Sequence, residues 1–317
     1  SRLESVFPPL TAAAGTAIVS GAGSGTNGVP SLMVKHPGED LDHWHTSFDR
    51  NEVLCETMWD VAKRLGKKVA LINWPVTFPM GMISEEDGCQ LAGSLNPPFR
   101  YFFMPLWDVS SSACFSNRLL HCNQIPGRAV QTKTRPAEGW TNLPDSKKPC
   151  LEFDITVPPT YVEGYEMHVL VYASTEEGYD RMLISESKNA AEAVTDITMG
   201  EYGPWITKRF QARDYERNGR FRFQILELSR DGQEFKLYQS AVNMADPYSV
   251  PASLSKEVET AAGTYMEVDD PWAFMDGWMN SDLYLEQLDF HADWWGRATK
   301  YVLENKEWDF AFSLVGT

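Results

Sequence analysis

The sequence feature that most constrains the fold is a helix-like segment that leads through one glycine into an apolar strand. Residues 52–65 carry apolar side chains at helical spacing, which predicts an amphipathic helix ended by Gly66. The run VALIN at 69–73 then predicts a buried strand before Trp74-Pro75. A helix that leads directly into such a strand is half of an α/β unit, so we expect a parallel sheet here. The apolar face of the predicted helix comprises Val53, Leu54, Met58, Val61, Ala62 and Leu65.

The middle of the chain follows a different pattern. After Pro149, β-branched and aromatic residues become frequent, and turn signals such as Pro158-Pro159 and Asp231-Gly232 separate the segments. Because no helical periodicity intervenes, we expect a mostly antiparallel β region. The predicted strands cover residues 151–157, 167–173, 181–187, 219–229 and 234–242.

The end of the chain returns to a helix and a strand. Residues 282–305 predict a helix, and residues 308–316 predict another buried strand. The apolar stripe of this helix comprises Leu283, Leu285, Leu288, Trp295, Ala298, Tyr301 and Val302. We therefore expect an α/β core formed by residues 1–80 and 251–317, interrupted by an irregular connection over 81–150 and a β-rich insertion over 151–250. Because a ligand loop or a helix ordinarily follows a core strand, we expect this core to be incomplete at both ends.

The charge and the cysteines limit the partners. The net charge of −16, from 28 basic and 44 acidic residues, argues against a nucleic-acid polymer, whose phosphates require Lys and Arg. No apolar run approaches the roughly 20 residues of a membrane helix, so we expect no membrane partner. The five cysteines form no CxxC pair, which favours reduced structural thiols. Cys114 and Cys122 could still bridge in an oxidising compartment, so the localisation stays open.

The stretch at residues 9–29 is made almost entirely of small residues. Gly23–Gly28 spells GxGxxG, but a dinucleotide site needs a helix that opens on the third glycine, and Pro30 follows almost at once. Thr11 comes where the extended Pro8-Pro9-Leu10 segment ends, which predicts that it caps a helix starting at Ala12. A hydroxyl at that position suits a phosphoryl group, although an ordinary capping threonine is the simpler explanation from these residues alone.

Further segments follow Thr11 in a characteristic order. Ser20-Gly21 and Asn27-Gly28-Val29 come first, then HPGEDLD at 36–42, and then residues 47–75, which end in GKKVALINWP. This order resembles the type I phosphodiesterase/nucleotide pyrophosphatase family of the alkaline phosphatase superfamily. Residues 139–157 and 285–314 are similar to a bacterial branch of it that has a β insertion. The chain has Ala13-Ala14 and Asn27 where the family has Pro-Asn and a His, which counts against nucleotide specificity.

The resemblance implies an alkaline phosphatase-like α/β/α sandwich, incomplete in this chain, with a mostly antiparallel β insertion. It implies a metal-dependent phosphoesterase that acts on a small phosphorylated substrate. Two divalent ions, usually zinc, would assist Thr11, which is both the nucleophile that forms a phospho-threonine and a metal ligand. The other Asp and His ligands are expected outside these 317 residues, on further segments of the same protein or on a separate chain. Asn27 and His36 are the candidate substrate-binding residues, although Asn27 also suits a turn and His36 a surface loop.

Two alternatives stay open at this point. Phosphomutase or phosphonate hydrolase chemistry would use the same scaffold. A non-catalytic protein would instead hold a ligand such as a glycan on the aromatic β region, although aromatic strand residues usually pack in a core or across strands. Candidates for that surface are Tyr165, Tyr172, Tyr179 and Trp205.

Overall fold

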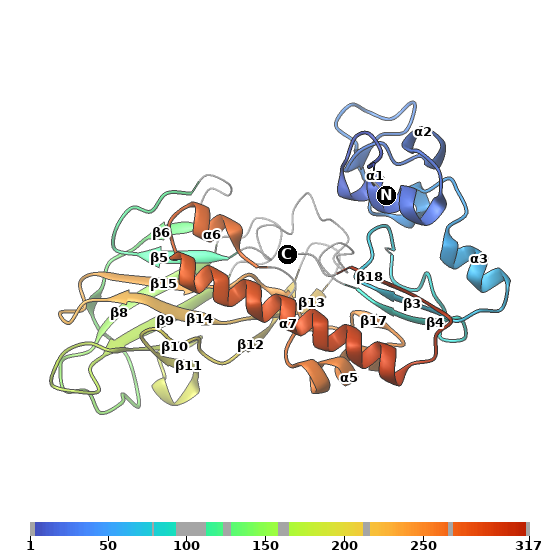
Figure 1. Cartoon of the computed structure of the whole chain (residues 1–317). Coiled ribbons are helices and arrows are strands. Elements are labelled where there is room, and N and C mark those ends of the chain that lie inside the picture. The colour runs from blue at the N-terminus through green and yellow to red at the C-terminus, as the bar shows by residue number, and fades with distance from the viewer. Residues whose placement is uncertain are drawn as a thin grey trace. The chain divides into compact units, whose positions relative to one another are not determined.

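The computed structural model describes residues 4–77, 79–92, 112–122, 128–157, 165–211, 216–265 and 269–314. The chain divides into two compact units. The α/β unit comprises Ser1–Met104, Pro247–Val268 and Leu288–Thr317, and the β unit comprises Pro105–Asp246 and Asp269–Gln287. Figure 1 shows their elements along the chain. Among the described residues, no helix combines the length and the apolar character needed to cross a membrane.

The α/β unit is built on a mixed sheet with the strand order β17-β4-β3-β18. β3 (Val69–Ile72) pairs in parallel with both β4 (Gly88–Leu91) and β18 (Phe310–Ser313), whereas β17 (Ser249–Val250) is antiparallel to β4. The parallel pairing predicted for residues 69–73 is therefore confirmed. All four side chains of β3 are fully buried, as expected for a strand covered on both faces.

Two helices cover one face of β3. Val69 and Leu71 share a hydrophobic cluster with Ala12 of α1 (Thr11–Ser20) and with Trp59 of α3 (Met58–Arg64). Trp59 also meets the ring of Phe312 on β18 edge to face. Ala70 and Ile72 alternate with Val69 and Leu71, so they point to the opposite face of the sheet. This arrangement fixes α1 and α3 on the strand that the sequence singled out.

α3 is shorter than the predicted helix over 52–65. Thr57 and Asp60 form a capping box that begins the helix at Met58, and the 3₁₀ turn η1 (Arg50–Glu52) precedes it. The predicted apolar face is correct at Val53 and Ala62, which are buried, and wrong at Leu54, Met58 and Leu65, which are exposed. Leu54 precedes the helix, and Trp59, which was not predicted, is buried on the inner side of α3.

The described strands of the β unit form three sheets. The first has the order β11-β10-β9-β8-β7, the second β14-β15-β5-β6 and the third β12-β13-β16. All pairings are antiparallel except that of β5 with β6, so the mostly antiparallel character predicted for this region is observed. The strands are β5 (Ala113–Ser116), β6 (Ala129–Gln131), β7 (Arg135–Pro136), β8 (Leu151–Val157), β9 (Tyr165–Tyr172), β10 (Arg181–Ser185), β11 (Ala193–Thr198), β12 (Ile206–Gln211), β13 (Glu216–Phe221), β14 (Phe223–Leu228), β15 (Phe235–Gln239) and β16 (Asn243–Met244).

Several boundaries differ from the predicted ones. The predicted strand 219–229 is two strands in different sheets, because Arg222 leaves the ladder and pairs its backbone with Ser240. The described part of 81–150, expected to be irregular, contains β4, β5, β6 and β7. These strands have at most four residues each, which is too short for an alternating pattern to stand out.

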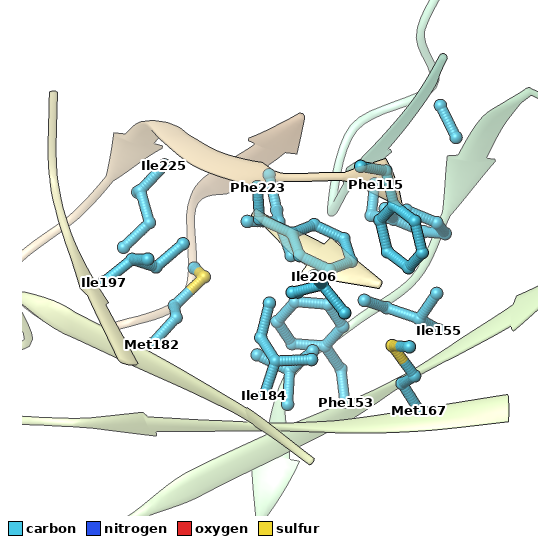
Figure 2. Close-up of a cluster of buried hydrophobic side chains, with 14 of the residues drawn as sticks. Phe115, Phe153, Ile155, Met167, Met182, Ile184, Ile197, Ile206, Phe223 and Ile225 are labelled. Atoms are coloured by element: carbon cyan, nitrogen blue, oxygen red, sulfur yellow. The ribbon is translucent and has the colours of Figure 1, made fainter. Parts of the chain in front are cut away.

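The core of the β unit lies between its sheets and is rich in aromatic rings (Figure 2). Phe153 of β8 and Phe235 of β15 stack with their centroids 4.4 Å apart. Ile155, Met167 and Ile184 are fully buried in the same cluster. Alternate residues of β8, β9 and β10 thus supply one continuous core.

The long helix predicted over 282–305 is α7 (Ser281–Asn305), drawn in red in Figure 1. Trp295, Ala298 and Val302 are fully buried as predicted, but Leu285 is exposed. Strand β18 lies at an edge of its sheet, so Phe310 is 46% exposed rather than buried. The remaining elements are α2 (Ser24–Asn27), β1 (Met33–Val34), β2 (His45–Thr46), η2 (Ala190–Glu192), α5 (Ser253–Ala262) and α6 (Pro271–Met275).

Candidate functional site

Thr11 is the first residue of α1 and not its N-cap. Leu10 occupies the cap position with an extended backbone, so the extended segment ends and the helix begins one residue earlier than predicted. The first helical hydrogen bond runs from the Ala14 amide to the Leu10 carbonyl, at 2.8 Å. Thr11 is exposed, and its hydroxyl has no hydrogen bond to any residue that the structure describes. The first-turn amides of α1 have no helical acceptor, and they form a local positive field beside this hydroxyl.

Close packing holds α1 on the segment that follows β3. A Cβ atom at Gly15 would lie 2.6 Å from Cγ of Pro75, so only glycine fits against that ring. Ala12, Ala13 and Thr16 are fully buried on the same side of the helix. Pro75 stands three residues beyond the carboxyl end of β3. Thr11 is thus on a helix packed at the carboxyl end of a parallel strand, the usual place for ligands in such sheets.

Asn73 ties the carboxyl ends of three strands together. Its amide donates to the carbonyl of Leu91 at the end of β4, at 2.9 Å. Its side-chain Nδ2 donates to the carbonyl of Leu314, just after β18, also at 2.9 Å. A positive φ of 51° at Asn73 makes this double role possible in a tight turn. These two hydrogen bonds therefore hold the carboxyl ends of β3, β4 and β18 together.

Asn27, a predicted substrate-binding residue, is fully buried at the end of α2. Its Nδ2 donates to the carbonyl of Ala22 at 2.8 Å, and its Oδ1 accepts the amide of Val29 at 2.9 Å. Both ends of the side chain thus bind the backbone of its own loop. The structure gives Asn27 the turn-forming role that the sequence left open, and its substrate role stays a prediction.

His36 belongs to a cluster of polar side chains on the hairpin formed by β1 and β2. Pro37 and Gly38 occupy the centre of a tight turn, with φ of +90° at Gly38, and the Glu39 amide donates to the His36 carbonyl at 3.3 Å. Strand pairing aligns Val34 with His45. The turn and the ladder together bring His36, Glu39 and His45 to one place.

The cluster is held by short polar contacts. His45 Nε2 lies 2.9 Å from Glu39 Oε1, and His36 Nε2 lies 2.8 Å from Glu52 Oε2. The rings of His36 and His45 stack with their centroids 4.2 Å apart. The hydrogen bond and the charge of Glu52 raise the pKa of His36, and the hydrogen bond from His45 lowers the pKa of the Glu39 carboxyl. Donor atoms of His36, Glu39 and His45 all lie within 4.8 Å of one another.

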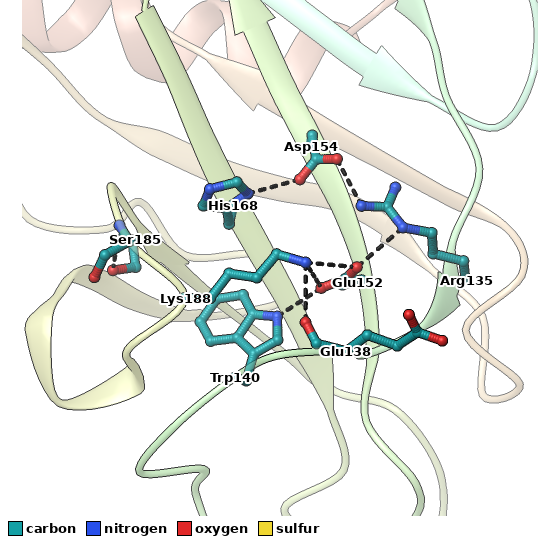
Figure 3. A network of polar contacts seen from close by, with 9 residues as sticks. Arg135, Glu138, Trp140, Glu152, Asp154, His168, Ser185 and Lys188 are labelled. Atoms are coloured by element: carbon teal, nitrogen blue, oxygen red, sulfur yellow. Dashed lines mark hydrogen bonds and ion pairs between the residues drawn. The ribbon is translucent and has the colours of Figure 1, made fainter.

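A second polar network lies on the five-stranded sheet of the β unit (Figure 3). Glu152 is buried and accepts hydrogen bonds from Lys188, Arg135 and Trp140 at 2.7–3.0 Å. Burial alone would raise the pKa of Glu152, but these hydrogen bonds and the two cations outweigh it and lower the pKa. Asp154 next to it accepts from Arg135 at 2.6 Å and lies 2.7 Å from His168. Glu152 is thus paired with Lys188 and Arg135, and Asp154 is paired with Arg135.

Of the aromatic residues considered for a ligand surface, Tyr172 is buried, and Tyr165, Tyr179 and Trp205 are half-buried. Tyr172 is 5% exposed and packs with Leu170 and Leu183. Tyr165 packs against the main core, and its hydroxyl donates to Gln239. The guanidinium of Arg222 covers the ring of Trp205, 4.7 Å from its centroid. These residues therefore support the fold, as aromatic strand residues usually do.

The β unit also has an open pocket of about 470 Å³. Trp278 and Met279 supply apolar walls, while Glu227, Lys236 and Glu286 bring charges of both signs. No candidate site residue from the sequence lines it.

The resemblance implies two divalent ions at Thr11, and the described residues do not provide a site of that kind. Ligand-capable side chains gather in two groups among them, His36 with Glu39 and His45, and Asp154 with Glu166 and His168. Neither group includes a residue of α1. Glu39 and Glu52 were not predicted as site residues. The His-Pro-Gly-Glu turn signal could have indicated Glu39, whereas nothing local connects Glu52 to His36.

None of the five cysteines forms a disulfide, so the possible bridge between Cys114 and Cys122 is not formed. Comparison of the chain with known protein families, with curated proteins and with solved structures found no significant match.

Proposed function

We propose that this chain carries the nucleophile segment of a metal-dependent phosphoester hydrolase with an alkaline phosphatase-like α/β/α core. The observation that supports this most directly is the position of Thr11. Its hydroxyl is exposed in the first turn of α1, and Gly15 seats that helix against Pro75 at the carboxyl end of β3. A free hydroxyl beside unpaired helical amides suits attack on an anionic phosphoryl group.

In the proposed reaction, Thr11 Oγ attacks phosphorus and displaces the alcohol of the ester. The hydroxyl proton is lost, the departing alkoxide gains a proton, and a phospho-threonine forms. Water then attacks the same phosphorus and breaks its bond to Thr11 Oγ, which regains a proton from that water. The product is phosphate when the substrate is a monoester and a phosphomonoester when it is a diester. The first-turn amides of α1 would bind phosphoryl oxygens and hold the phosphorus in line with Thr11.

Divalent ions in such enzymes activate the hydroxyl and stabilise the oxygen that leaves. Since the described residues form no two-ion site around Thr11, we assign no step to these ions. Their ligands would come from residues other than those described, on the same protein or on a separate chain.

The test is hydrolysis of bis(p-nitrophenyl) phosphate with Zn²⁺ or Mn²⁺ by the whole natural protein, including any segments that flank this chain. Thr11→Ala should lower kcat by on the order of 10⁴-fold, because loss of a covalent nucleophile removes most of the rate enhancement. Thr11→Ser should keep measurable turnover. Thr26→Ala, at an exposed threonine of the neighbouring helix α2, is the matched control and should behave like wild type.

Retention of more than a tenth of the wild-type rate in Thr11→Ala would rule out the nucleophile assignment. The same preparation should be assayed with p-nitrophenyl phosphate and p-nitrophenyl phenylphosphonate. A strong preference for the phosphonate, or transfer of the phosphoryl group to a second alcohol, would favour phosphonate hydrolase or mutase chemistry on the same scaffold.

A further inference from the structure

We propose that His36, Glu39 and His45 bind one divalent transition-metal ion such as Zn²⁺, and that Glu52 positions His36 for this role. The site lies on the hairpin of β1 and β2 and is separate from the ions that the proposed hydrolysis requires. It would supply two imidazole nitrogens and one carboxylate oxygen, a donor set that zinc accepts in proteins.

The spacing of the donor atoms suits a single ion. Glu39 Oε1 lies 2.9 Å from His45 Nε2 and 3.8 Å from His36 Nδ1. Ligands about 2.0–2.1 Å from a tetrahedral zinc stand about 3.3–3.4 Å from one another. Because the two imidazole rings are stacked, both must turn about their side-chain torsions so that their lone pairs point at one ion. Such turns would complete the three-ligand arrangement without moving the backbone.

Glu52 gives an independent reason to favour a metal site. Its Oε2 lies 2.8 Å from His36 Nε2, so the Nε2–H of a neutral ring donates to the carboxylate. The unprotonated nitrogen is then Nδ1, which is the atom that faces Glu39. A carboxylate that binds the far nitrogen of a ligating histidine fixes its tautomer and orientation in many zinc sites.

The charge around the hairpin also favours a cation. Residues 35–52 contain five carboxylates and, besides the histidines, two cationic side chains, Lys35 and Arg50. Lys35 donates to the carbonyl of Asp40. That arginine is engaged by Asp60 at 2.5 Å and by the carbonyl of Val53, away from the cluster. The side chains of His36 and His45 are 49% and 29% exposed, which leaves a further coordination position open to water or to a small ligand.

The other group of possible ligands lacks these features. Asp154 in that group already binds the guanidinium of Arg135 at 2.6 Å, and a neighbouring cation opposes metal binding. His168 therefore provides a control histidine that is paired with a carboxylate but is not expected to bind a metal.

The test is to titrate the full chain with Co²⁺ and with Zn²⁺ at neutral pH. Calorimetry measures the binding of both ions, and the visible spectrum reports the bound Co²⁺. The His36→Ala and His45→Ala variants should each bind one equivalent of metal fewer than the wild-type chain. Glu52→Gln should keep that equivalent but bind it about 10–100-fold more weakly, because it removes the positioning carboxylate. The Co²⁺ spectrum should lack a thiolate charge-transfer band, which excludes Cys55 as the ligand.

His168→Ala and Thr11→Ala should both leave the metal stoichiometry unchanged. Circular dichroism of each variant verifies that it is folded. The proposal is overturned if His36→Ala and His45→Ala keep the full stoichiometry, or if His168→Ala removes the metal. Failure of this site leaves the Thr11 assay unaffected, since that assay follows turnover and not metal binding at the hairpin.

Discussion

Gly15 of α1 and Pro75 of the turn after β3 are packed so closely that no side chain fits between them. A methyl group at Gly15 would stand 2.6 Å from Cγ of Pro75 and 3.4 Å from its Cβ. The proline ring cannot rotate away as a flexible side chain would. This single contact therefore sets how near α1, and with it Thr11, approaches the carboxyl end of the sheet.

Gly15→Ala should accordingly destabilise the α/β unit. Overpacking of a tight contact typically costs about 1–3 kcal/mol. The higher helix propensity of alanine offsets at most about 1 kcal/mol of this destabilisation. Urea unfolding of wild type and of Gly15→Ala measures the change in the free energy of unfolding. Gly25→Ala in α2 is the control, because no atom lies within 4 Å of its added Cβ, and it should be neutral or slightly stabilising. Equal stability of the two variants would contradict the close packing.

Asn27→Ala should lower the free energy of unfolding by about 2–3 kcal/mol. It leaves the half-buried carbonyl of Ala22 and the buried amide of Val29 without their side-chain partner. Asn51→Ala, at an exposed asparagine, should change it by less than about 0.5 kcal/mol. Chemical denaturation monitors both. A stable Asn27→Ala protein that binds phosphate poorly would instead support the substrate role of Asn27.

The stability of the β unit should fall at acid pH through Glu152. The cations and hydrogen bonds around it lower its pKa in the folded state below the value of about 4.3 in an unfolded chain. Its contribution is therefore complete above that unfolded value and is lost as the pH falls through the folded pKa. Thermal unfolding between neutral and acid pH should show this loss.

Glu152→Gln should remove that part of the pH dependence and cost about 1–3 kcal/mol at neutral pH, since charged hydrogen bonds to Lys188 and Arg135 are weakened. Glu166→Gln, at an exposed carboxylate on the neighbouring strand β9, is the comparison and should retain the wild-type profile. If wild type and Glu152→Gln lose stability in the same way as the pH falls, Glu152 is not the source of this pH dependence.

Two of the five thiols should resist alkylation in the folded protein. Burial raises the pKa of Cys89 to about 11 and that of Cys114 to about 12, so almost no thiolate forms at neutral pH. Iodoacetamide labelling followed by peptide mass spectrometry should find these two unmodified until denaturant is added. Cys55, which is partly exposed, serves as the internal control and should react first. Rapid labelling of Cys114 in the native state would contradict its burial.

The sequence by itself determined the elements with a strong local pattern. The run at 69–73 became β3 with parallel neighbours, and the helix over 282–305 became α7, because an uninterrupted apolar or periodic segment has few other ways to be buried. It also indicated that Thr11 lies at the start of a helix, and was wrong by one residue about where the helix begins. Short strands such as β4 (GCQL) and β5 (ACFS) were missed because, unlike β3 (VALI), they do not form an uninterrupted apolar run.

Only the tertiary structure decided which distant side chains meet. Glu52 lies 16 residues beyond His36 and approaches it because η1 and the β1–β2 hairpin fold together, which no local spacing indicates. The close approach of Gly15 to Pro75 likewise depends on how α1 packs on the sheet. Local propensity and periodicity are properties of neighbouring residues, whereas contacts between segments depend on how buried surfaces fit together. The sequence therefore determined the principal elements, and packing between them decided where the reactive groups stand.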